Sequence, residues 1–201
     1  MPTQYEAYES GDNDDGGAAG AQWPGQTFTP SVTHTITRFD FYGRRTGTLT
    51  GTAYIRIYAA NANNAPTGGL LASGSFDPST IGTSNAWNQI SLTTPRVLQA
   101  GTKYIAYLEY SGGAQWTNYL IWRDDTTGSY AGGIALVSTD SGSSWTQYAN
   151  FDFLFREWGT PTSVSNIAYL VEVDWNNDGD FSDANEDITD DVLMPIRWKR
   201  G

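Results

Sequence analysis

The feature that most constrains this chain is an alternation of apolar and polar residues with a period of two. The clearest run spans residues 53–59, in which the apolar positions are Ala53, Ile55, Ile57 and Ala59. Successive side chains of a strand point to opposite faces, so this pattern predicts a strand with one buried face. Residues 151–156 alternate in the same way, and no long segment carries a 3.6-residue apolar period. We therefore expect a β protein with almost no helix.

Further strands are expected between clusters of turn-forming residues. These clusters occupy residues 63–69, 100–102 and 111–113, and their Gly, Pro, Asn and Ser content suits tight turns. The same reasoning predicts strands at residues 35–42, 70–76, 87–93, 103–110, 119–123 and 133–138. Their short, regular spacing predicts an all-β fold, an antiparallel two-sheet sandwich that is jelly-roll-like.

The composition divides the chain into four segments. Residues 1–21 contain an acidic, Gly-rich run and are expected to form a flexible or extended lead-in. The sandwich is expected over residues 22–159, followed by a linker at residues 160–166. Residues 167–201 hold two alternating stretches around an acidic loop, which predicts a C-terminal β-hairpin. A lone hairpin is too small to be stable, so we expect it to pack on the sandwich, on a partner chain or on a further part of the protein.

Charge and cysteine content exclude several kinds of partner and site. The formal net charge is −11, and the chain contains no Cys. Binding to nucleic acid or to anionic lipid relies on Lys and Arg, so neither is an expected partner, and a thiolate site is excluded. No stretch approaches the roughly 20 apolar residues of a membrane-spanning helix, so membrane insertion is not expected. The first residues lack a basic start and an apolar stretch, so no signal peptide is expected.

The sharpest local motif is the acidic loop of the predicted hairpin. Oxygen-bearing side chains occupy alternate positions from Asp174, and Gly179 stands at the sixth position, a spacing that can wrap a Ca²⁺ ion. The twelfth position is Asn185, where an EF-hand has Glu. The alternative is a plain hairpin loop held by side-chain hydrogen bonds to its own backbone. The predicted ligands are Asp174, Asn176, Asp178, Asp180, Ser182, Glu186 and Asp187.

Two features that suggest an enzyme are assigned structural roles. Residues 138–145 resemble the Asp-box of sialidase propellers, in which the motif forms a β-hairpin away from the active site, and a propeller requires repeated blades. His34 is the only histidine, so a multi-histidine zinc site is not expected. Its neighbours Thr33 and Thr35 give no nucleophile-base-orienter arrangement, so a Ser-His-Asp triad is not expected either. Carboxylates such as Glu109 and Glu157 are not distinguished from ordinary strand-end charges. We therefore predict that the chain is not an enzyme.

One stretch of aromatic and polar residues suits carbohydrate binding. Aromatic rings stack on the apolar faces of pyranose sugars, and neighbouring polar groups bond the sugar hydroxyls. Trp and Tyr also fill sandwich cores and subunit interfaces, so a structural role is the alternative. The candidate residues are Trp116, Tyr119, Trp122, Asp124, Asp125 and Tyr130.

Several short runs point to a known group of proteins, namely residues 26–30, 64–68, 100–104, 130–133 and 151–159. Together they resemble a jelly-roll-like sandwich of phage and other virion-associated proteins and of bacterial surface proteins. The tail, at residues 169–175 and 196–201, resembles the opening of a domain found in phage minor tail proteins.

The resemblance implies a non-catalytic, virion-associated structural protein, such as a tail, fibre or capsid-decoration component that mediates assembly and host-surface attachment. Its expected location is the virion or the extracellular space. Its expected partners are other virion subunits, including further copies of this chain, and a cell-surface glycan. The alternative is a carbohydrate-binding module of a larger secreted or surface protein.

Overall fold

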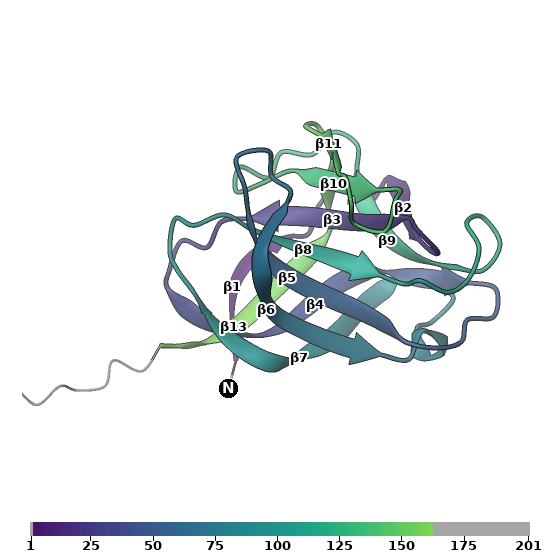
Figure 1. Cartoon of the computed structure of the whole chain (residues 1–201), viewed down its shortest axis with the longest axis horizontal. Coiled ribbons are helices and arrows are strands. Elements are labelled where there is room, and N and C mark those ends of the chain that lie inside the picture. Colours follow the sequence, from purple (N-terminus) through teal and green to yellow (C-terminus); the bar gives the residue numbers. More distant parts are fainter. Residues whose placement is uncertain (1, 163–201) are drawn as a thin grey trace, which may run out of the picture. The chain divides into compact units, whose positions relative to one another are not determined.

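The computed structural model describes residues 2–162, which form a two-sheet β-sandwich (Figure 1). Within this range the structure contains thirteen strands, one 3-10 turn at Pro78–Thr80 and no α-helix. The predicted all-β class and the two antiparallel sheets are thus confirmed. The predicted C-terminal hairpin at residues 167–201 lies outside the described residues, as does most of the predicted linker at residues 160–166.

Each sheet combines strands that lie far apart in the sequence. The seven-stranded sheet follows the order β1 (Thr3–Tyr8), β13 (Phe155–Pro161), β4 (His34–Thr46), β9 (Tyr119–Asp125) and β12 (Asp152–Phe153), with β2 (Asp14–Ala18) paired to β9 and β7 (Ala86–Leu98) paired to β4. The six-stranded sheet follows the order β11 (Thr146–Tyr148), β10 (Ala135–Ser138), β3 (Trp23–Phe28), β8 (Tyr104–Glu109), β5 (Ala53–Ala60) and β6 (Pro66–Phe76). Every pairing is antiparallel.

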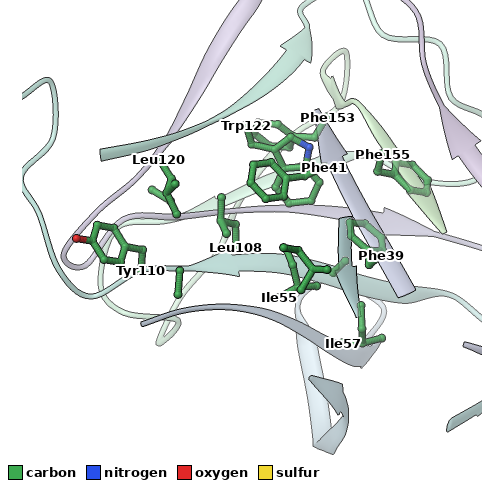
Figure 2. Close-up of a cluster of buried hydrophobic side chains, with 14 of the residues drawn as sticks. Phe39, Phe41, Ile55, Ile57, Leu108, Tyr110, Leu120, Trp122, Phe153 and Phe155 are labelled. Carbon is green, nitrogen blue, oxygen red and sulfur yellow. The ribbon is translucent and has the colours of Figure 1, made fainter. Parts of the chain in front are cut away.

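Alternate side chains of the two sheets meet in one apolar core, part of which Figure 2 shows. Trp122 of β9 lies 5.0 Å from Phe153 and 5.9 Å from Phe39, measured between ring centroids. Ile55 and Ile57 of β5 are fully buried, as their alternation predicts. Each such side chain contributes about 1.5–3 kcal/mol when it leaves water, so this core supplies the main favourable term of folding.

The expected lead-in at residues 1–21 is instead two strands of the seven-stranded sheet. β1 pairs with β13, and β2 pairs with β9 from Asp14 to Ala18. A Cβ atom at Gly16 would lie 2.2 Å from the Phe153 ring, and one at Gly17 would lie 2.5 Å from the Gln115 side chain. These glycines therefore allow β2 to pack closely, although the same composition suggested flexibility in the sequence.

Residues 151–156 form two strands where the sequence predicted one. β12 pairs with β9, and β13 pairs with β4. Leu154 stands between them and bonds both neighbours, because its N–H donates to the Arg123 carbonyl and its own carbonyl accepts from the Tyr42 N–H. The apolar alternation continues across this change of partner, so periodicity alone could not reveal it.

Candidate binding site

The structure does not gather the predicted sugar-binding residues on one surface. Trp122 is fully buried, and its indole N–H donates to the Leu154 carbonyl at 2.8 Å. Its ring faces contact core aromatics, so no face is open to a sugar. Tyr119, Asp124 and Asp125 are also buried. The predicted Ca²⁺ ligands at residues 174–187 all lie outside the described residues.

Asp125 and Tyr130 belong to an internal hydrogen-bond network. The Tyr8 hydroxyl donates to Asp125 at 2.6 Å, and the backbone N–H of Thr127 donates to the same carboxylate at 2.9 Å. The Tyr130 hydroxyl donates to Glu6 at 3.0 Å. These bonds attach the chain that follows β9 to strand β1, so both residues have a structural role here.

Trp116 is the one candidate that the structure presents to solvent. It lies in the turn between β8 and β9, and 74% of its surface is exposed, the largest value among the exposed large hydrophobic side chains of the described chain. Its backbone φ is +68°, a left-handed conformation that costs a bulky residue about 1–3 kcal/mol. Tyr119 meets the indole edge-on, with ring centroids 5.8 Å apart. The turn therefore holds a large apolar ring in water at an energetic cost.

Two hydrogen bonds close this turn beneath Trp116. The N–H of Ala114 donates to the Asn118 carbonyl at 2.8 Å, and the N–H of Asn118 donates to the Ala114 carbonyl at 2.9 Å. The bulky ring thus stands at the tip of a closed loop, which limits the conformational entropy that a ligand would have to remove.

The turn between β4 and β5 supports the Trp116 turn from the side. The N–H of Thr48 donates to the Asn118 side-chain oxygen at 3.2 Å. A Cβ atom at Gly47 would lie 1.9 Å from that same oxygen, and Gly47 has a φ of +68°. Figure 1 shows both turns at the right-hand end of the sandwich, away from the N-terminus. Sequence reasoning missed Thr48 because 70 residues separate it from Asn118.

Gln115, which precedes Trp116, carries an unsatisfied amide. Neither its side-chain nitrogen nor its side-chain oxygen has a hydrogen-bond partner within the described residues, and both atoms are buried. A buried polar group without a partner costs about 1–3 kcal/mol. No sequence pattern singled out Gln115, because an unsatisfied group is a property of the fold.

A second group of aromatic residues covers the outer face of the six-stranded sheet. Tyr107 stacks against Trp23 and against Tyr58, each at a centroid distance of 5.8 Å, and Trp145 lies 5.2 Å from it. Tyr107 is consequently buried. Trp23, Tyr58 and Trp145 are half-buried, and their packing on Tyr107 adds apolar burial to this face of the sheet.

The Asp-box turn has the structural role that its sequence predicted. Asp140 accepts hydrogen bonds from the backbone N–H and the hydroxyl of Ser144, at 2.8 and 2.6 Å. The Trp145 indole N–H donates to the Gly142 carbonyl at 3.1 Å. These bonds form the hairpin between β10 and β11 and point to no reacting group.

His34 and Glu157 form a buried pair of titratable side chains. His34 and Glu157 are fully buried and bond each other at 2.8 Å. Between residues 2 and 162, no group of three or more His, Cys, Asp or Glu side chains is arranged to hold a metal ion. In the same range no helix has the length and apolar character needed to cross a bilayer.

Asp124 is a buried carboxyl group whose pKa can be tested by experiment. Burial, together with the nearby Asp14, raises the pKa of Asp124 to about 7, and one of its oxygens has no partner among the described residues. A raised acid pKa means that the folded state binds the proton more tightly, so stability falls as pH rises from about 4 to about 7.

The variant Asp124→Asn is therefore expected to be more stable than the wild type at pH 8, by about 1–3 kcal/mol. At pH 4, where the folded state is protonated and the unfolded state is about half protonated, most of the gain should disappear. Urea unfolding at the two pH values measures both quantities. An equal effect at both would show that Asp124 does not titrate as described.

The fold and these contacts define the class of the protein, an all-β two-sheet sandwich domain with one exposed aromatic turn. A family model described as a domain of unknown function, DUF4082, matches residues 14–152, from β2 to β12. The chain belongs to this family. No curated protein matches the chain.

Proposed function

We propose that this domain is a non-catalytic module that binds a carbohydrate through Trp116. The observation that supports the proposal most directly is the 74% exposure of this indole in a strained backbone conformation. Both features cost stability, and such costs concentrate at binding sites. A Trp ring offers the flat apolar face that pyranose sugars stack on, with polar turn residues beside it to bond the hydroxyls.

The location and the partners follow from the same proposal. Surface attachment through a glycan suits a virion or extracellular protein, as the sequence resemblance implied. In this role the chain carries out no reaction, so it needs only a rigid sandwich that holds the turn in place. The paired turns at residues 46–52 and 111–118 provide that support through the Thr48–Asn118 hydrogen bond.

A virion-associated assembly role is a second proposal, favoured by the exposed first half of the edge strand β6. This strand lies at the end of the six-stranded sheet, and Leu70 within it is 40% exposed. Exposed strand edges can pair with another subunit, such as a second copy of this chain. A monomeric wild type over a wide concentration range in light scattering would count against this role.

Replacing Trp116 by alanine is expected to weaken binding to the recognised glycan about tenfold or more, since a Trp anchor commonly supplies this much. Tyr148→Ala is the matched control, because Tyr148 is also an exposed aromatic residue, at 39%, on strand β11. A glycan array followed by titration calorimetry measures both variants. If both bind glycan as the wild type does, or if the wild type binds none, the proposed function is wrong.

A further inference from the structure

We infer that the Trp116 site takes a neutral glycan, one built from uncharged pyranose units. This inference rests on the proposed function and adds the class of ligand. It depends on which chemical groups the fold places around the exposed indole, and on which groups it leaves out.

The two turns that form the site contain no charged residue. Residues 46–55 and 110–122 are free of Asp, Glu, Lys and Arg, in a chain that has 22 acidic and 11 basic residues. The polar residues next to Trp116 in the chain are the amides Gln115 and Asn118 and the hydroxyl residue Thr117, and Thr48 reaches the Asn118 side chain through its backbone N–H. Amides and hydroxyls both donate and accept hydrogen bonds, as sugar hydroxyls do.

The nearest basic residue in the sequence is Arg45, at the end of β4. Its guanidinium donates to the Gly47 carbonyl within the supporting turn, and its Nε atom has no partner among the described residues. Neither turn itself offers a uronate, sialate or sulfate group a cationic partner at Trp116. Desolvating an unpaired anion is strongly unfavourable, and the net charge of −11 repels such a ligand at longer range.

Gln115 supplies a polar group that a neutral ligand can satisfy. Its amide lies next to Gly17 with no partner among the described residues. Rotation of the side chain toward Trp116 would let this amide bond a sugar hydroxyl, so that ligand binding removes an unsatisfied group from the interior. A carboxylate or sulfate can only accept hydrogen bonds, whereas a hydroxyl can use both the donor and the acceptor of the amide.

Affinity electrophoresis tests the inference with the full chain. The gels contain a neutral β-glucan or mannan, or the acidic counterparts polygalacturonate and a sulfated galactan. We expect a neutral polysaccharide to retard the wild type and Tyr148→Ala, and Trp116→Ala to lose about tenfold or more in affinity. Gln115→Ala should weaken the same interaction by a smaller factor. The retardation should not change between about 50 and 500 mM salt, because screening acts only on charges.

The outcomes separate the ligand class from the proposed function. One outcome is that an acidic polysaccharide retards the wild type, with a retardation that is lost in Trp116→Ala and weakens with salt. That result would overturn the neutral ligand class and leave the binding function in place. Retardation by a neutral polysaccharide that Trp116→Ala does not change would overturn the site. If no polysaccharide retards the wild type, the proposed function fails together with the inference.

Discussion

Replacing Trp122 by alanine is expected to lower the free energy of unfolding by about 3–5 kcal/mol, the usual range for an aromatic residue removed from a core. The side chain has no exposed surface and contacts Phe39, Phe41 and Phe153. The substitution also leaves the Leu154 carbonyl without one of its two donors. Urea unfolding followed by circular dichroism measures the loss.

Trp116→Ala is the matched comparison for this experiment. Because most of its ring is in water, its loss should change the free energy of unfolding by less than about 1 kcal/mol, as surface substitutions commonly do. Alanine also carries a Cβ atom, so the strain of the left-handed backbone stays about the same in the variant. If Trp116→Ala destabilised the chain as much as Trp122→Ala, the turn would be part of the core and could not be a binding surface.

Replacing His34 by leucine is expected to cost about 3–5 kcal/mol at pH 6, because it leaves the buried Glu157 without its partner. The His34 ring nitrogens face the Val32 carbonyl and the Glu157 carboxylate, each at 2.8 Å, so both nitrogens carry a proton when both bonds form. Tyr5 of β1 stacks on the ring at 3.8 Å. The double variant His34→Leu with Glu157→Leu should recover most of the loss, since it removes both charges.

The same pair predicts how stability changes with pH. Burial alone would lower the pKa of His34, but its hydrogen bonds to Glu157 and Val32 and the charge of Glu157 raise it above the ordinary value. Burial raises the pKa of Glu157, although His34 acts in the opposite direction. Both raised values mean that the folded state holds protons more tightly than the unfolded chain.

The contribution of His34 is therefore complete below its unfolded pKa of about 6.5 and is lost as pH rises through the higher folded value. The wild type should lose stability on the alkaline side of this range, and the double variant should lose less. Urea midpoints measured at half-unit steps of pH provide the comparison. Parallel profiles for the two proteins above neutral pH would show that His34 is not protonated in the folded state.

The sequence predicted the strands well where one face was apolar and the other polar. Ile55 and Ile57 point into the core as their alternation required. The pattern fails for residues 119–123, which are apolar at four successive positions, so it does not say which way Trp122 points. Trp116 and Trp122 are the same residue type six positions apart, and only the turn that ends before β9 places one in water and the other in the core.

The candidate site could be predicted only in part, because its contacts join distant segments. Trp116 was identified from its residue type and its neighbours. Thr48 and Gly47 come from another turn. Both contact the Asn118 side chain, and this contact is visible only in three dimensions. Gly16 and Gly17 were interpreted as part of a flexible segment because of its Gly-rich composition. The sequence does not show that the Phe153 and Gln115 side chains occupy the space next to them.

The pairing of β1 with β13 determines how the domain would respond to mechanical force. Thr3 lies opposite Gly159, so the strand that begins the sandwich and the strand that ends it have their outer ends side by side. A pull applied between residues 3 and 161 would load the hydrogen bonds of this pair one after another, as in a zipper, rather than all at once in shear. Sequential rupture needs less force, so under tension β1 would peel away first, while the Trp116 turn at the other end of the sandwich (Figure 1) would stay folded.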